Sequence, residues 1–131
     1  MVSAGTKYGL RFIAELARNW GGGPVDAASV AARRGIPEAY LRKIATALKR
    51  AGLVEADRGQ AGGYRLSRSP SEMSALDVFE ALETPVSGPS GGGDPTDDVW
   101  RRMAGFSRAF LAKERIADLA AAPPGADAWT I

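Results

Sequence analysis

The feature that most constrains the fold is a change at Gly52 in the spacing of apolar residues. Before this glycine, apolar residues recur at helical spacing and predict helices over about 6–18, 27–34 and 37–50. After it, short β-type segments at 53–56 and 64–67 flank a glycine-rich stretch. Three helices followed by a hairpin is the element order of a winged helix-turn-helix. The predicted fold class is therefore mainly α with a small β-hairpin.

Residues that favour helix ends support these boundaries. Asp26 is suited to cap the second helix, and Gly35 is suited to follow its last turn because glycine readily adopts a positive φ. Pro37 suits the first position of the third helix, where its missing N–H would have no partner. Ser74 is expected to cap a fourth helix over about 75–83.

The remainder of the chain divides into a linker and one long helix. Proline and glycine dominate residues 84–96, which predicts a flexible linker. A long amphipathic helix is predicted from there to about residue 122, before prolines begin a short tail. The expected organisation is a winged helix-turn-helix domain at 1–83, the linker at 84–96, the long helix at 97–122 and the tail at 123–131.

Composition excludes several kinds of chemistry. The 131 residues include no cysteine and no histidine, so disulfides, thiolate-held metal sites, a cysteine nucleophile and a histidine base are all impossible. Carboxylates and serines form no recognisable catalytic pattern, so we predict that the chain is not an enzyme. Asp94, Asp97 and Asp98 are close together, but the first turn of a helix favours acids without any metal. We therefore expect no metal site and no cofactor.

The charge is distributed unevenly along the chain. Residues 1–70 carry 12 Lys and Arg against 5 Asp and Glu, a net +7, whereas residues 71–131 carry 5 against 10, a net −5. A basic half of this kind indicates a polyanionic partner. The sequence has no apolar run of the roughly 18–20 residues that a membrane-spanning helix needs and no signal-peptide pattern, so we expect a cytoplasmic location.

The polar face of the third helix carries the candidate major-groove residues. In a helix-turn-helix the second of the two helices lies in the major groove of DNA. Arg42 and Lys43 lie near the start of this helix, where an arginine favours guanine O6 and N7. Thr46 lies on the same face, and Lys49 and Arg50 at the far end are better placed for phosphates. The alternative is an ordinary solvated helix face.

The predicted hairpin carries a second candidate group. Arg58 has little apolar cover on a glycine-rich tip, which suits insertion into a narrow minor groove of negative potential. Gly59, Gly62 and Gly63 would let the backbone approach phosphates closely, or they are plain hairpin glycines.

These residues also resemble a known family. The ordered string GIP, YL, L-x-x-AGLV and RG-x-x-GGY-x-L is similar to that of the Rrf-two family of bacterial winged-helix transcriptional regulators, which includes IscR and NsrR. The resemblance extends over most of the chain, through KYGLRFIAELA at the start and VWRRM and IADLA near the end.

The resemblance implies a homodimer in which the long helix at 97–122 is the dimerisation helix. Two winged heads would then bind double-stranded DNA at a pseudo-palindromic operator, and the protein would act as a sequence-specific transcriptional regulator, with repression as the expected outcome. The family's major-groove contacts correspond to Ala39, Tyr40, Arg42 and Lys43, and its minor-groove arginine corresponds to Arg58.

The sequence departs from the family in two places. Many members have Glu-Gln where this chain has Arg42 and Lys43, so its operator is expected to differ. Cluster-binding members place three cysteines between residues 83 and 100, where this chain has none, so an iron–sulfur sensor is excluded. A small-molecule or protein effector stays open. The alternative function is a winged-helix protein-interaction module that does not read DNA sequence.

Overall fold

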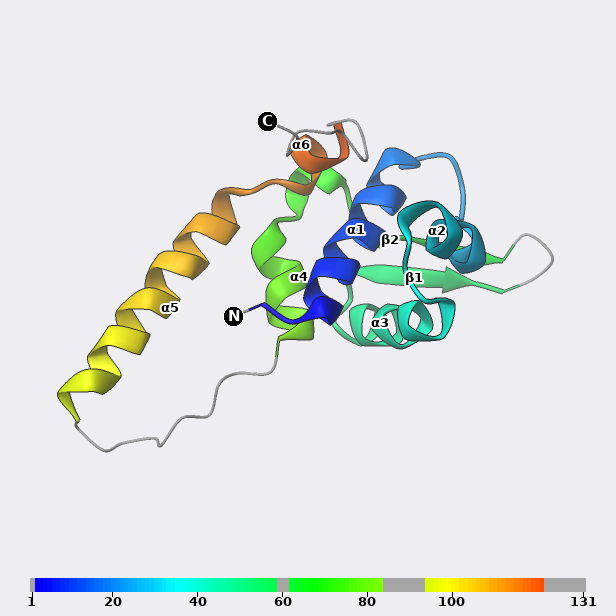
Figure 1. The fold of residues 1–131 in the computed structure, drawn as a ribbon. Coiled ribbons are helices and arrows are strands. Elements are labelled where there is room, and N and C mark those ends of the chain that lie inside the picture. Colours follow the sequence, from blue (N-terminus) through cyan, green and yellow to red (C-terminus); the bar gives the residue numbers. More distant parts are fainter. Residues whose placement is uncertain (1, 59–61, 84–93, 122–131) are drawn as a thin grey trace, which may run out of the picture.

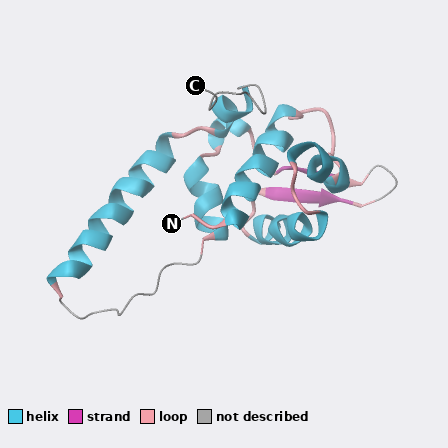
Figure 2. Ribbon diagram, in the orientation of Figure 1, coloured by secondary structure: helices cyan, strands magenta, loops and turns pink. Residues whose placement is uncertain are grey.

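The computed structural model describes residues 2–58, 62–83 and 94–121. The head of the molecule is a group of helices with a small two-stranded hairpin at one side, and one long helix extends away from the head (Figures 1 and 2). In chain order the elements are α1 (Ala4–Arg18), α2 (Ala27–Arg34), α3 (Glu38–Arg50), β1 (Val54–Asp57), β2 (Gly63–Leu66), the short 3-10 helix η1 (Pro70–Glu72), α4 (Ala75–Leu82), α5 (Pro95–Lys113) and α6 (Ile116–Ala121).

Helix α1 lies at the centre of the head and supplies much of its core. Phe12, Ile13 and Leu16 are buried there, and α2, α3, α4, α6 and β2 pack around this helix. The ring of Phe12 meets Tyr64 of β2 edge to face at 5.6 Å. The largest fully buried side chains come from almost every element of the head: Phe12, Ile13, Leu16, Leu41, Leu48, Leu66, Met73, Ile116, Val30, Val54 and Val78.

The turn between α2 and α3 has the end signals that the sequence predicted, with one difference. Asp26 caps α2 by accepting a hydrogen bond from the Ser29 N–H at 3.2 Å, and Gly35 follows the helix with a φ of 65°. Pro37 is not the first helical residue, because its ψ of 127° is extended. It precedes the helix instead, and its carbonyl accepts the first helical hydrogen bond from Leu41 N–H at 2.9 Å.

The hairpin forms as predicted but is shifted by one residue on each strand. Its antiparallel register runs from Val54 opposite Leu66 to Asp57 opposite Gly63. The second strand also bonds to the segment before α2, where Tyr64 and Val25 exchange two backbone hydrogen bonds of 2.8 Å. These bonds fix the hairpin against the helix-turn-helix.

Helix α4 begins with a capping box. Ser74 N–H donates to Asp77 Oδ2 at 2.9 Å and Asp77 N–H donates to Ser74 Oγ at 3.4 Å, so both ends of the box are satisfied. The cap that the sequence predicted at Ser74 is therefore confirmed. The sequence did not predict η1, a single turn just upstream.

The last part of the chain is two helices rather than the one predicted over 97–122. Helix α5 ends at Lys113, and the backbone is extended at Glu114 before α6 begins. The break places backbone groups against the head: Ala75 N–H donates to Glu114 O at 2.8 Å and Ile116 N–H donates to Met73 O at 2.9 Å. It also buries Ile116 completely. Tertiary hydrogen bonds and burial thus outweigh the local helical pattern.

Much of the predicted linker, 84–93, and the end of the chain, 122–131, lie outside the described residues. Asp94, Pro95 and Thr96 were also predicted as linker, but α5 begins at Pro95, and Asp94 caps this helix by accepting a hydrogen bond from Thr96 N–H at 2.7 Å. Among the helices of the described residues, none combines the length and apolarity needed to cross a membrane.

Candidate nucleic-acid interface

Helix α3 has one face in the core and one in solvent. Leu41, Ile44, Ala45 and Leu48 are buried at helical spacing. The opposite face is exposed and holds six of the predicted residues, Ala39, Arg42, Lys43, Thr46, Lys49 and Arg50. Tyr40, which its spacing placed on the apolar stripe, is instead 40% exposed and lies at the edge between the two faces. Lys43, Lys49 and Arg50 form no ion pair within the described part of the chain, so their charges are directed to solvent. The core packing of α3 therefore presents a basic surface.

Arg42 is held in place by its own helix. Its Nη2 donates to Glu38 Oε1 at 2.9 Å, one turn earlier, and this hydrogen bond raises the pKa of Arg42 above its ordinary value. Thr46 Oγ1 donates to the Arg42 carbonyl at 3.0 Å, which fixes the Thr46 side chain. Both Arg42 and Glu38 stay about half exposed, so Glu38 orients the guanidinium without covering it.

Tyr40 has a structural contact in addition to its exposed surface. Its ring meets Tyr8 of α1 edge to face at 5.7 Å, and its hydroxyl lies close to Gly5. Sequence reasoning did not single out Arg11, whose guanidinium lies over the Tyr8 ring at 5.6 Å. Helix α1 thus adds an exposed cation beside the start of α3. The sequence contained a signal for this contact, because Tyr8 and Arg11 are three residues apart in a predicted helix, a spacing at which side chains meet.

The hairpin places Arg58 at the end of β1. Its side chain is exposed and no carboxylate of the described residues pairs with it. Gly59 lies outside the described residues, and Gly62 stands at the entry to β2.

The structure explains why position 63 is a glycine, which the sequence alone did not show. A Cβ at this position would overlap the carbonyl oxygen of Val25, so glycine is needed where β2 joins the segment before α2. Its φ is not positive. This glycine therefore serves the fold directly, whatever it contributes at a phosphate.

A second arginine of the hairpin was also missed. Arg65 stands opposite Glu55 in the register and pairs with it at 3.1 Å, and it pairs with Asp57 at 2.6 Å. Its charge is thereby neutralised by its neighbours. Arg58, seven residues earlier, is the hairpin arginine left with an unneutralised charge in the described residues.

The arrangement defines the class of protein. A helix-turn-helix with a basic exposed second helix, followed by a hairpin with an exposed arginine, is a winged helix-turn-helix of the nucleic-acid-binding type. The model for Rrf2, described as an iron-dependent transcriptional regulator, matches residues 2–122. The chain belongs to the Rrf2 family.

Individual relatives agree with this assignment. The HTH-type transcriptional regulator CymR of Bacillus subtilis (strain 168) is 38% identical over 86 residues, a match that spans 66% of this chain and 62% of CymR. The HTH-type transcriptional regulator IscR of Cereibacter sphaeroides is 34% identical over 116 residues, which span 79% of this chain and 75% of IscR.

Solved structures give the same fold. The structure of CymR, the global cysteine regulator of B. subtilis, superimposes with a TM-score of 0.80 at 32% identity and covers 92% of this chain and 95% of that one. IscR of T. potens gives a TM-score of 0.77 at 33% identity, covering 91% and 85%. The chain is thus a transcription regulator of the helix-turn-helix type and not an enzyme. The protein-interaction module, the alternative function, is not favoured.

The iron in the family description does not fit this chain. The family's iron–sulfur clusters need thiolate ligands, and the sequence contains no cysteine and no histidine. Within residues 2–58, 62–83 and 94–121, acidic residues also form no group of three that could hold a metal ion. Asp98, for example, pairs with Arg101 at 3.2 Å and with Arg102 at 3.0 Å. We therefore assign no iron chemistry to this protein.

Proposed function

We propose that this protein is a homodimeric repressor that binds a pseudo-palindromic operator in double-stranded DNA by reading its sequence. The observation that carries the proposal is the solvent-facing surface of α3, where Lys43, Lys49 and Arg50 are exposed with no carboxylate among the described residues to neutralise them. Unpaired cations on a helix of this fold suit the phosphates and base edges of a major groove.

Each predicted residue has a proposed role. Arg42 and Lys43 contact base edges, with Glu38 holding Arg42 in its working orientation. Ala39 and Tyr40 contact the same groove, and Thr46 lies beside Arg42 on that face. Lys49 and Arg50 bind phosphates. Arg58 enters the minor groove at the wing, and Gly59, Gly62 and Gly63 let the wing backbone approach the DNA.

Helix α5 supports the homodimer. Its large apolar side chains are exposed, at 47% for Val99, 51% for Met103, 78% for Phe106 and 63% for Phe110. These four follow at intervals of four, three and four residues, the spacing by which helices pair along a seam. Trp100 beside them is 61% exposed. A second copy of α5 would cover this surface, and two-fold symmetry would match a pseudo-palindrome.

Repression is the outcome that we propose for a dimer whose operator lies at a promoter. Bound at a promoter, it would compete with RNA polymerase for the same DNA. An effector, either a small molecule or a protein, would change the affinity of the dimer for that DNA. We propose that this regulation takes place in the cytoplasm.

The test is a selection of bound duplexes from a random pool with the full chain. The expected result is one enriched pseudo-palindrome. Arg42→Ala should weaken binding and relax the preferred base at one position of each half-site by about 1–3 kcal/mol. Lys49→Ala should weaken all duplexes alike and lower the salt dependence of binding. A pool with no enriched sequence would contradict sequence reading and return the protein-interaction module to consideration.

A further inference from the structure

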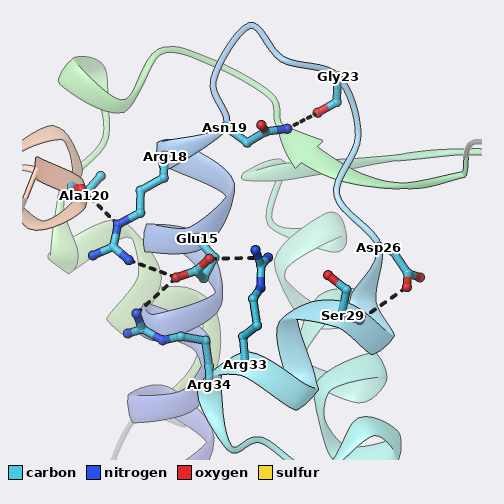
Figure 3. A network of polar contacts seen from close by, with 9 residues as sticks. All are labelled: Glu15, Arg18, Asn19, Gly23, Asp26, Ser29, Arg33, Arg34 and Ala120. Atoms are coloured by element: carbon cyan, nitrogen blue, oxygen red, sulfur yellow. Dashed lines mark hydrogen bonds and ion pairs between the residues drawn. The ribbon is translucent and has the colours of Figure 1, made fainter. Parts of the chain in front are cut away.

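A buried carboxylate on α1, that of Glu15, faces one arginine of α1 and two of α2 (Figure 3). The Glu15 side chain is only 9% exposed. Its Oε1 lies 3.0 Å from Arg18 Nη1 and 3.1 Å from Arg34 Nη1, and its Oε2 lies 3.5 Å from Arg33 Nη2. One negative charge is therefore shared among three positive charges, which leaves this cluster with an excess of cation.

The cluster borders a hollow between α1 and α2 with a volume of about 600 Å³. Asp26 is the second carboxylate on its wall, and it is engaged in capping α2. Three guanidinium groups against two carboxylates give the wall a net positive charge. None of the residues that line this hollow comes from α3 or the wing tip.

Arg33 is the least engaged of the three arginines. It is 58% exposed, whereas Arg18 is 23% and Arg34 is 17% exposed, and its contact with Glu15 is the longest. Ser29 lies one helical turn before Arg33 on the same face of α2, and its hydroxyl has no hydrogen-bond partner in the described part of the chain. A guanidinium with free N–H groups beside a free hydroxyl is a good donor set for an oxyanion.

We propose that this hollow binds a small molecule with a phosphate or carboxylate group. Arg33 and Ser29 donate hydrogen bonds to the anion, and Arg34, which also lines the hollow, adds positive charge. Glu15 competes with the ligand from inside the protein, because it occupies the same guanidinium groups. The inference deepens the proposed function and rests on it, since the hollow would be the site at which an effector acts.

The contacts of the cluster indicate how anion binding in the hollow would affect the rest of the molecule. Arg18 contacts Glu15 and also donates from Nε to the Ala120 carbonyl of α6 at 3.0 Å. Helix α6 follows α5 after two residues. Glu15 thus joins α2 of the helix-turn-helix to the helix that continues the long arm. An anion that draws Arg33 and Arg34 away from Glu15 would loosen that connection.

The experiment is equilibrium dialysis of the full chain with inorganic phosphate, at constant ionic strength and without DNA, repeated with succinate as a carboxylate probe. We expect saturable binding of at least one of these two probes. Arg33→Gln should weaken it about tenfold, since a hydrogen bond to a charged group has about this effect on a dissociation constant. Arg102→Gln, on the exposed face of α5, is the matched control and should bind like the wild type.

Glu15→Gln should change the affinity for the anion in the opposite direction from Arg33→Gln. Removing the internal competitor should strengthen anion binding, and the anion should restore stability that the variant loses. If Glu15→Gln does not fold, the comparison of Arg33→Gln with Arg102→Gln still decides. No saturable binding of either probe would overturn the proposal, as would binding that is lost in Lys43→Gln and retained in Arg33→Gln, because the ion would then lie on the surface of α3.

Operator binding measured in chloride buffer distinguishes a failure of the anion-site proposal from a failure of the proposed DNA-binding function. Arg33→Gln should bind the selected duplex as the wild type does when the buffer contains no inorganic phosphate and no carboxylate. A wild-type protein that binds phosphate at Arg33 and selects no duplex would contradict the proposed function and leave the anion site standing.

Discussion

Helices α1 and α5 are the two long helices of the molecule, and they use apolar residues in opposite ways. Of the 15 residues in α1, eight are buried, including Phe12, Ile13 and Leu16. Of the 19 residues in α5, none is buried, although its sequence includes Trp100, Phe106 and Phe110. Apolar residues of α1 thus stabilise a single chain, whereas the large exposed ones of α5, the arm, stabilise it little until a second surface covers them.

The largest expected effect tests this difference directly. Phe12→Ala should lower the free energy of unfolding by about 3–5 kcal/mol, because the fully buried ring leaves a cavity at the centre of the core. The measurement is urea unfolding followed by circular dichroism over a range of protein concentrations, since association contributes to the stability of a dimer.

Phe106→Ala is the matched variant in the arm. At the lowest protein concentration it should leave the urea midpoint almost unchanged, because a ring that is 78% exposed in one chain stabilises that chain little. A loss as large as that of Phe12→Ala at this concentration would show that the arm packs on its own head.

The next effect concerns association. Phe106→Asp should weaken the proposed dimer by about 2 kcal/mol or more, since a charge would replace an aromatic anchor in the middle of the proposed α5 interface on both copies. Sedimentation equilibrium should show a shift from dimer to monomer. Trp20→Ala is the control, because Trp20 is a 49% exposed aromatic residue in the head and should leave the dimer intact. A dimer that survives Phe106→Asp would place the interface elsewhere.

Much of the head could be predicted from the sequence, because its signals are local. The caps at Asp26, Gly35 and Ser74 depend on neighbours within three or four residues, and each forms as expected. The break after Lys113 could not be predicted, because it depends on hydrogen bonds to residues 73–75, about 40 positions away. The need for glycine at position 63 has the same origin, in its contact with Val25.

The candidate site follows the same rule. Exposure of the basic residues on α3 was predictable, because the apolar stripe at Leu41, Ile44 and Leu48 fixes which face is buried. The cluster around Glu15 was not, because it joins α1 to two arginines on α2, and no sequence spacing shows that these helices meet there. DNA contacts by individual residues stay predictions.

A smaller effect separates two arginines of the hairpin. Arg58→Ala should weaken operator binding by about 1–3 kcal/mol and leave folding unchanged, because its side chain is exposed and unneutralised by described neighbours. Arg65→Ala should instead lower stability by about 0–1 kcal/mol through its lost pairs with Glu55 and Asp57. Fluorescence anisotropy with the selected duplex, beside urea unfolding, measures both. Equal losses of affinity would mean that the wing binds DNA through its overall charge.

The smallest expected effect is on the pH dependence of stability and concerns Glu83, the last residue described before residues 84–93. Hydrogen bonds from Ser3 N–H and Thr6 Oγ1, both 2.8 Å, hold the pKa of this carboxyl below its ordinary value. The unfolded chain therefore binds the proton more readily than the folded one. The stabilisation is complete above the ordinary glutamate pKa of about 4.3 and is lost as the pH falls through the lower, folded-state pKa. Glu83→Gln should make urea midpoints less dependent on pH in this acidic range.

Glu72→Gln is the control for this measurement, because the Glu72 carboxylate has no hydrogen bond or ion pair within the described residues. Its acid unfolding should match that of the wild type. Because Glu83 joins α4 to the first turn of α1, the loss belongs to the head alone, and Phe106→Asp in the arm should leave this pH dependence unchanged at low protein concentration. A change in the arm variant would show that the two regions are not independent, and the contrast between a self-sufficient head and a partner-dependent arm would then fail.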